Sequence, residues 1–407
     1  MCNMAKLNNL MSRGDFLKRS ALLSAATVGG AVLAGCSGET EEGAVAQREP
    51  TETKGSEPTQ PTRVDASTKV VLLGVGGGPV AKKKQHGISQ AVVVDGKVYL
   101  VDCGTGLFDQ LYKAGLIGSF RQTENLHSVF ITHMHSDHTA DYFSHLLLAW
   151  PEHEINVYGP GRPDQLPREF AKAPEGGFPV VDPLGITPVP GIEDMTRFST
   201  AAFAYDINLR MRDEGRPHLP EYIIPHDIEL PEGVGRDYVY EETERGVVGT
   251  APEMEPFVVL PEDENGVTVK ATLVNHAPVF PAFAYRFDTP DGSIVISGDT
   301  SPSENLINLA QGADILVHEV LHQPSIEKLV PEDVPNRDEQ LYHIYGAHTA
   351  STAVGKVARD ANVKKLVLTH LVPADEIVPD EVWWDHAKAD FDGEVIVGKD
   401  LLEVGVE

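Results

Sequence analysis

Short apolar runs, each ended by glycines or a polar residue, recur along the chain from about residue 69 onward. The run KVVLLGVGGG at 69–78 is rich in β-branched residues, and QAVVVDGKVYLVD at 90–102 divides at an Asp-Gly pair that suits a tight hairpin turn. The folded part is therefore expected to open with β structure. The same pattern predicts strands at 128–132, 155–158, 267–275, 282–287, 293–297, 314–318 and 365–369.

Apolar residues with helical spacing follow several of these runs. Leu107, Phe108 and Leu111 share one face of a predicted helix that ends at Gly115. Strands that alternate with helices in both halves predict an α/β fold, in which helices lie outside sheets. Further helices are expected at 141–150, 303–310, 349–361 and 381–388.

The pattern loosens between about 160 and 265, where prolines and glycines are frequent. One helix is predicted there, at 198–213, because Phe198, Ala202, Tyr205 and Leu209 share a face. Long irregular segments inside a domain are often functional. Two interpretations stay open: an insertion packed on the surface of the core, and a lid over a functional site.

The first 36 residues have the layout of a secretory signal peptide. Basic residues precede a weakly apolar stretch that is too short and too rich in Gly and Ala to span a bilayer. The stop LAGC at 33–36 resembles the bacterial lipobox, which makes Cys36 the predicted lipid anchor. Residues 37–68 are rich in Glu, Thr, Pro, Gly and Gln, which predicts a disordered acidic linker. We therefore expect an exported, membrane-anchored lipoprotein of the cell envelope or periplasm.

The export route stays open. The segment SRGDFLK at 12–18 resembles a twin-arginine signal, but Gly14 stands where the second arginine belongs. The three cysteines are Cys2, Cys36 and Cys103, and the first two lie in the expected export segment. No internal disulfide is therefore expected.

The formal net charge of the 407-residue chain is −28. A strongly acidic surface repels polyanions and leaves few lysines and arginines for phosphate groups. On this ground no nucleic-acid partner is expected.

The densest ligand chemistry lies in ITHMHSDHTAD at 131–141, directly after an apolar strand. A His-x-His pair on a loop, here His133 and His135, can place two imidazoles on one metal ion. Asp137 and His138 follow at an offset that can turn them toward a second ion. Two ions need more ligands, and residues of the right type end three later strands. These are His276, Asp299 and His370.

Together, THMHSDH, His276, SGDT and LTH resemble the metallo-β-lactamase superfamily, in the branch of ribonuclease Z and the arylsulfatase-like hydrolases. VLLGVGGGP and VYLVDCGTG fit the same family, so the resemblance covers most of residues 69–400 outside 160–265. It implies one hydrolase domain at 69–407, a four-layer αββα sandwich with an inserted segment at about 160–265. It also implies two zinc ions, although manganese or iron would suit the same ligands.

Carried onto matching positions, the resemblance divides seven ligands between the two ions. One ion is bound by His133, His135 and His276; the other by Asp137, His138 and His370; Asp299 bridges them. A hydroxide between the ions would attack the substrate, and Asp137 would accept a proton as a catalytic residue.

Two further motifs match the family. His348, in GAHTAST, is expected to donate a hydrogen bond to the reacting oxygen or to protonate the leaving group. The alternative is a histidine at a helix start with no catalytic part. His318 and Glu319 match a family His-Glu pair that would orient His348 or another ligand, and simple buried polar pairing is the alternative.

Ribonuclease Z carries a basic, glycine-rich arm for transfer RNA between the third histidine motif and the bridging aspartate. Here 299 − 276 = 23 residues separate these positions, enough only for a hairpin. With the acidic charge and the export signal, this favours a small ester substrate: an aryl sulfate, a phosphodiester or a lactone. The alternatives are a ribonuclease Z-like phosphodiesterase acting on transfer RNA precursors and a non-catalytic metal-binding surface lipoprotein. A redox member would need a carboxylate in place of a motif histidine. The oligomeric state stays open.

Overall fold

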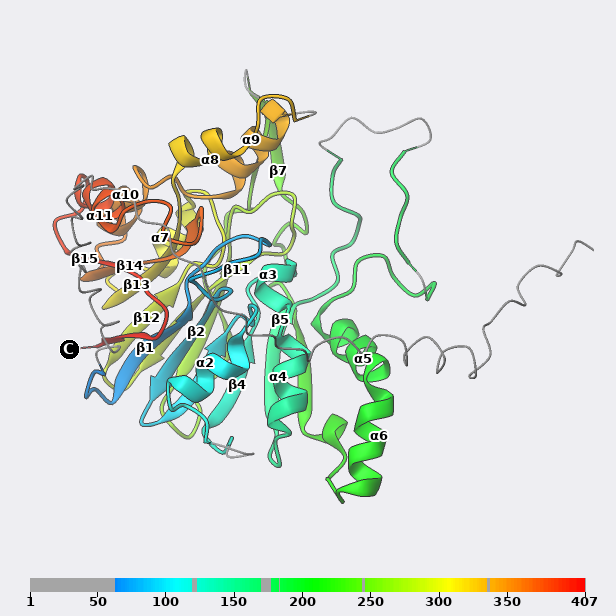
Figure 1. Cartoon of the computed structure of the whole chain (residues 1–407). Coiled ribbons are helices and arrows are strands. Elements are labelled where there is room, and N and C mark those ends of the chain that lie inside the picture. Colours follow the sequence, from blue (N-terminus) through cyan, green and yellow to red (C-terminus); the bar gives the residue numbers. More distant parts are fainter. Residues whose placement is uncertain are drawn as a thin grey trace, which may run out of the picture. The chain divides into compact units, whose positions relative to one another are not determined.

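The structure is a computed structural model that describes residues 63–118, 123–169, 177–182, 184–243, 246–334 and 337–406 (Figure 1). The chain divides into two compact units, residues 1–57 and 58–407, and the described residues belong to the second. The predicted signal peptide, Cys36 and most of the predicted linker lie outside the described residues. Within the described part, no helix is long and apolar enough to cross a membrane.

The first sheet has seven strands in the order β16-β1-β2-β3-β4-β5-β6. Its β2–β3 hairpin turns at Asp95 and Gly96, which both have positive φ, as the Asp-Gly pair predicted. Strands β3 to β6 run parallel to one another. The strands are β1 (Thr68–Gly74), β2 (Ser89–Val94), β3 (Lys97–Val101), β4 (Leu126–Phe130), β5 (Ile155–Pro160), β6 (Ile223–Ile228) and β16 (Leu402–Gly405).

The second sheet also has seven strands, in the order β15-β14-β13-β12-β11-β10-β9. Strands β12 to β15 are parallel, whereas β9 to β12 are joined antiparallel. A separate hairpin pairs β7 (Val239–Thr243) with β8 (Gly246–Thr250). The strands of the second sheet are β9 (Phe257–Leu260), β10 (Thr268–Leu273), β11 (Phe283–Thr289), β12 (Gly292–Ile296), β13 (Ile315–Leu321), β14 (Lys365–Val372) and β15 (Glu394–Val397).

Helices cover the outer faces of both sheets (Figure 1). Helix α2 packs on β1 of the first sheet, and α7, α10 and α11 pack on strands of the second. The helices are α2 (Leu107–Lys113), α3 (Ser136–Thr139), α4 (Tyr142–Ala149), α5 (Ile192–Ala202), α6 (Ala204–Asp213), α7 (Glu304–Leu309), α8 (Gln323–Leu329), α9 (Arg337–Ala347), α10 (Val354–Asp360) and α11 (Asp380–Lys388), with a short 3-10 helix at Leu219–Glu221.

Strand β1 shows why the strands are almost continuously apolar. Val70 and Leu72 join the core between the two sheets, whereas Val71 and Leu73 join the core beneath the helices of the first sheet. Successive side chains of a strand point to opposite faces, so a strand buried on both faces needs apolar residues throughout. The fold is the predicted four-layer αββα metallo-β-lactamase sandwich, and the fold-class prediction is confirmed.

The single helix predicted at 198–213 is wrong. The chain forms α5 and α6, which meet at Phe203, where φ is −96° and ψ is 7°. The face used for the prediction is exposed: Tyr205 keeps 84% and Leu209 49% of its surface accessible. Ile192 and Ile207 are buried instead, so packing against the first sheet decided the orientation that the pattern suggested wrongly. The 160–265 segment also supplies β6 to the sheet, so part of it belongs to the core.

His145 on α4 predicts a pH-dependent stability. It is fully buried, its Nδ1 lies 3.0 Å from the carbonyl oxygen of Asp141, and its Nε2 has no partner. Burial lowers the pKa of its ring to about 4. In the unfolded chain this histidine therefore takes up a proton near pH 6.5, whereas in the folded chain it does so only near pH 4. The neutral, buried ring therefore contributes to the free energy of unfolding at pH 7, and this contribution is lost as pH falls from about 6.5 to about 4.

We expect about 2–3 kcal/mol of stability to be lost from this one group between pH 7 and pH 4.5. Urea unfolding at both pH values should show a correspondingly smaller loss in His145→Gln. Parallel pH profiles for the two proteins would contradict this account.

Candidate metal centre

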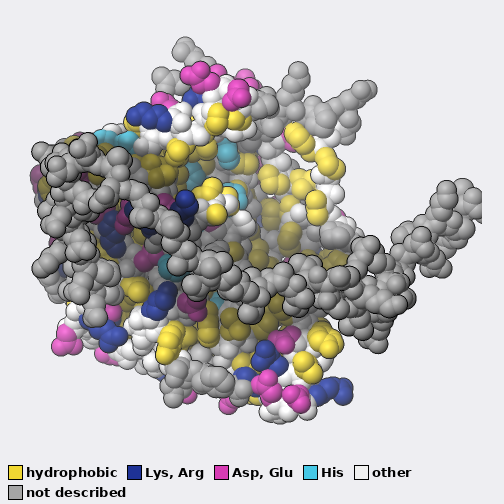
Figure 2. Space-filling view, viewed as in Figure 1, with side chains coloured by type: hydrophobic (Ala, Val, Ile, Leu, Met, Phe, Trp, Pro, Cys, Tyr) yellow, Lys and Arg dark blue, Asp and Glu magenta, His cyan; other side chains and the backbone are white. Residues whose placement is uncertain are grey.

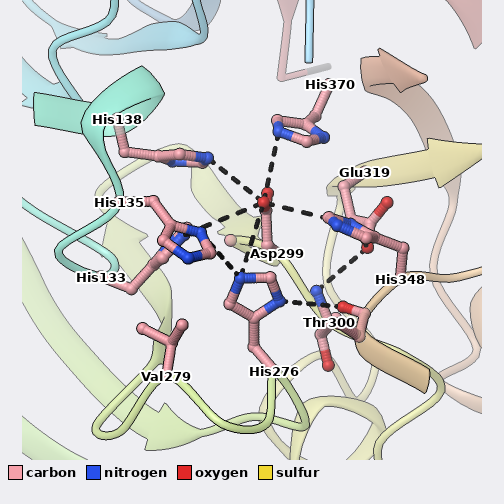
Figure 3. A network of polar contacts seen from close by, with 12 residues as sticks. His133, His135, His138, His276, Val279, Asp299, Thr300, Glu319, His348 and His370 are labelled. Atoms are coloured by element: carbon pink, nitrogen blue, oxygen red, sulfur yellow. Dashed lines mark hydrogen bonds and ion pairs between the residues drawn. The ribbon is translucent and has the colours of Figure 1, made fainter. Parts of the chain in front are cut away.

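The seven predicted ligands lie together where strands from both sheets end. Figure 3 labels six of them, all but Asp137. His133 and His135 follow β4, and Asp137 and His138 lie on the one-turn helix α3. His276 follows β10, Asp299 follows β12, and His370 lies within β14, where its φ is 43°. Parallel strands end at one edge of a sheet, so residues more than 100 positions apart in the sequence come to one place.

The first group of ligand atoms consists of three imidazole nitrogens. Nδ1 of His135 lies 3.1 Å from Nε2 of His133 and 3.2 Å from Nε2 of His276. Each of the two Nε2 atoms lies 3.9 Å from Oδ2 of Asp299. Three nitrogens of neutral rings facing one another at this spacing suit a shared cation, as in zinc sites built from histidines.

The second group faces the same Asp299 oxygen. Its Oδ2 lies 3.3 Å from Nε2 of His138 and 3.2 Å from Nε2 of His370. Oδ2 of Asp137 lies 3.7 Å and 3.4 Å from these two nitrogens. One carboxylate oxygen therefore faces both groups, which is the arrangement that a bridging ligand between two ions requires.

Buried atoms without partners indicate where cations fit. Nε2 of His138 and Oδ1 of Asp299 are buried and have no hydrogen-bond partner. A buried polar atom without a partner costs free energy, and a bound cation would supply the missing partner to both atoms. The donor set of imidazoles and carboxylates matches zinc or a similar divalent metal. The residues fit two such ions.

The electrostatics agree with metal binding. Burial holds the pKa of His133 and of His276 well below its usual value, so both rings are neutral at pH 7 and can ligate. Burial by itself raises the pKa of Asp299, but the facing rings of His370 and His138 hold it well below its usual value. The carboxylate is therefore ionised.

Asp102 is a supporting residue that the sequence analysis missed. Its Oδ2 lies 2.8 Å from Nδ1 of His138, and its Oδ1 accepts a hydrogen bond from the backbone N–H of Thr132 at 2.8 Å. Its backbone has a φ of 59°, unusual for a residue with a side chain. The motif VYLVDCGTG contained this aspartate, but nothing in the sequence linked it to His138, 36 positions later.

Removing the Asp102 carboxylate should weaken metal binding. A carboxylate on the far nitrogen of a ligating histidine fixes its tautomer, and losing one typically costs 10–100-fold in metal affinity or activity. We expect Asp102→Asn to lower zinc affinity by roughly that factor. Competition with a chelator would measure it, and unchanged zinc affinity would contradict the role.

His348 and Glu319 form a pair beside the ligands. Nδ1 of His348 lies 3.1 Å from Oε1 of Glu319 and 4.0 Å from Oδ2 of Asp299. The same Glu319 oxygen accepts hydrogen bonds from the backbone N–H groups of Thr300 and Thr349. His318 is buried, and its Nδ1 contacts the carbonyl oxygen of Glu319 at 2.7 Å. The carboxylate of Glu319 therefore contacts His348, whereas Nδ1 of His318 contacts a backbone carbonyl oxygen.

A lysine-rich loop adjoins this centre. Residues 78–87 line a cavity of about 490 Å³ together with Ser136 and Asp137, so Lys82, Lys83 and Lys84 lie beside a predicted ligand. Lys82 donates to the carbonyl oxygen of Gly78 at 2.6 Å, and Lys84 pairs with Glu376 at 2.7 Å. Three consecutive cations next to the candidate ligands form a local basic region in an acidic chain.

The fold and the ligand cluster define a class: a metal-dependent hydrolase of the metallo-β-lactamase superfamily. The chain is 30% identical over 338 residues to ribonuclease Z of Mycobacterium bovis (strain BCG / Pasteur 1173P2), covering 83% of this chain and 98% of that protein. The chain therefore belongs to the ribonuclease Z family within that superfamily. Residues 68–141 also match the family model described as anti-Pycsar protein Apyc1.

Solved structures show the same fold at low sequence identity. A long-form RNase Z from yeast has a TM-score of 0.52 and 13% identity, covering 84% of this chain and 42% of that one. Zn²⁺-bound PqqB from Methylobacterium extorquens has a TM-score of 0.50 and 13% identity, covering 83% and 99%.

The prediction that nucleic acid is not a partner is wrong, because relatives of this identity and coverage are ribonucleases. Net charge is a property of the whole chain, whereas binding depends on the local potential at the site. Figure 2 shows basic side chains interspersed with acidic ones on one face, and the lysine loop adjoins the ligands. The expectation of a small ester as the partner loses the charge argument as one of its supports.

Proposed function

We propose that this protein is an exported phosphodiesterase that hydrolyses RNA at a dinuclear zinc centre. The observation that carries the proposal is Oδ2 of Asp299, which faces both groups of candidate ligands. Membership of the ribonuclease Z family supports RNA as the substrate. The lipobox and signal layout support export and anchoring at Cys36.

We assign the ligand roles as the sequence suggested. One ion would be held by His133, His135 and His276, the other by Asp137, His138 and His370, and Asp299 would be shared. Bound zinc would supply Lewis-acid stabilisation of the phosphate oxygens and would lower the pKa of water.

The protein's own residues supply the proton chemistry. Asp137 would accept a proton from the attacking water. His348, held by Glu319, would protonate the departing oxygen on the other side of the phosphorus. Asp102 keeps His138 in the tautomer that presents Nε2 to the centre.

Substrate binding would depend on the lysine loop. Between His276 and Asp299 the chain forms only β11, β12, the hairpin turn between them and short flanking loops, and every residue of this interval is described. A projecting arm is therefore absent from this interval, and RNA phosphates must be neutralised elsewhere. Lys82, Lys83 and Lys84 line the cavity that Asp137 also lines, so RNA bound in this cavity would meet them.

The salt dependence of RNA cleavage tests the proposed role of the lysine loop in substrate binding. Each phosphate neutralised on a single strand contributes about −0.7 to the slope of log affinity against log salt. Replacing Lys82, Lys83 and Lys84 with alanine should therefore flatten the slope of log(kcat/KM) by up to about 2. Turnover of a small aryl phosphodiester should change far less, because it presents one phosphate.

Lys356→Ala is the matched control, since this lysine is 62% exposed on α10 and pairs with Asp360. Aryl sulfate and lactone substrates are run in parallel. Cleavage of one of these with no cleavage of RNA would overturn the proposal.

A further inference from the structure

A second cluster of ligand-type side chains lies away from the metal centre. His127 is near the start of β4 in the first sheet, and Asp263 and Glu264 lie between β9 and β10 of the second sheet. One atom from each lies within 4.8 Å of the others. The metal centre follows the other end of β4, so the two clusters lie at opposite ends of this strand.

The spacing in this cluster exceeds that of direct hydrogen bonds. Nε2 of His127 lies 3.5 Å from Oδ2 of Asp263 and 3.7 Å from Oε1 of Glu264. An N–H···O hydrogen bond is about 2.7–3.2 Å long. Two ligands that are each about 2.1 Å from a tetrahedral zinc ion lie roughly 3.4 Å apart. The observed spacing is closer to that of ligands around an ion.

Two of the three side chains are held in place. Oδ1 of Asp263 accepts backbone N–H bonds from Asn265 at 2.9 Å and Val267 at 3.0 Å, and its Oδ2 accepts a bond from the hydroxyl of Tyr99. The ring of Tyr99 lies 4.6 Å from that of His127. The site is thus preorganised before any ion arrives.

The charge balance also favours a cation. The side chain of Asp263 is only 6% exposed, and among the described residues His127 is its one ion-pair partner. Two carboxylates, those of Asp263 and Glu264, therefore share one histidine, and a cation would balance their charge. Glu264 is 76% exposed, so the third ligand can close on an ion from solvent, with water as a fourth ligand.

We propose that His127, Asp263 and Glu264 bind one divalent cation of the zinc type, separate from the catalytic ions. The ion ties β4 of the first sheet to the β9–β10 connection of the second and so stabilises the sandwich. This site does not depend on the proposed activity.

Zinc stoichiometry and thermal unfolding of the full chain test the proposal. Wild type is compared with His127→Ala and with Glu264→Gln, whose exposed position separates loss of the ion from misfolding. The control is His218→Ala, because His218 is a half-exposed histidine paired with a single acidic residue, Glu221. Zinc bound at the metal centre contributes equally to all four proteins.

Equilibrium dialysis against zinc, followed by elemental analysis, should find one more ion per chain in wild type and in His218→Ala than in the two cluster variants. At zinc a hundredfold above Kd, the Tm of wild type should exceed that of the cluster variants by about 4 °C. The variants should keep wild-type turnover. Equal zinc content in wild type and both cluster variants overturns the proposal.

Discussion

Asp299→Asn is expected to remove at least one of the two zinc ions of the proposed centre and to lower kcat/KM by roughly 10³-fold or more. Oδ2 of Asp299 lies 3.2 Å from Nε2 of His370 on one side and 3.9 Å from Nε2 of His276 on the other. An amide has no negative charge to balance two cations that share it. Both groups of ligands therefore lose affinity together.

Elemental analysis after dialysis at limiting zinc, with turnover of an aryl phosphodiester, checks this expectation. Asp314→Asn is the matched control, because Asp314 is also a largely buried aspartate but pairs with Lys364 at 2.5 Å. Retention of two ions and of wild-type turnover in Asp299→Asn would show that the two groups do not share this oxygen.

His348→Ala is expected to lower kcat for RNA by about 10²–10⁴-fold while zinc content stays unchanged. Burial by itself lowers the pKa of His348, but the facing carboxylate of Glu319 raises it to about 9. Glu319 therefore favours the protonated ring, which is the form that can give a proton to a departing oxygen.

The leaving group provides the decisive readout for His348. An alkoxide leaving from RNA needs a proton, whereas p-nitrophenolate is stable without one. The loss in His348→Ala should therefore be much smaller with a p-nitrophenyl phosphodiester. Glu319→Gln should show the same selectivity with a smaller loss, because the ring remains but its proton is held less firmly. A loss of zinc in His348→Ala would make His348 a ligand instead.

Much of the centre could be predicted because its densest part is local. His133, His135, Asp137 and His138 lie within one turn and a short loop, so their spacing alone indicates metal binding. The alternation of strand and helix patterns likewise predicted an α/β fold, because periodicity is a local property, whereas the sandwich was implied by the family resemblance.

Contacts across the fold could not be predicted in the same way. Asp102 reaches His138 only because β3 and β4 are neighbours in the sheet, and the lysine loop reaches Asp137 only because β1 ends at the same edge. On either side of the break at Phe203, Ile192 of α5 and Ile207 of α6 are the residues buried in the core. The charge argument against RNA was wrong because the net charge of the whole chain does not describe the electrostatic potential at one site.

The sequence by itself determined the α/β class through alternating strand and helix patterns. Ligand-type residues at the ends of predicted strands, together with the family resemblance, supplied the candidate ligands. Tertiary structure alone decided which ligands share Asp299, which carboxylates support the histidines and where the basic loop lies. Those features depend on distances between residues far apart in the chain, and only the packing of the two sheets sets these distances.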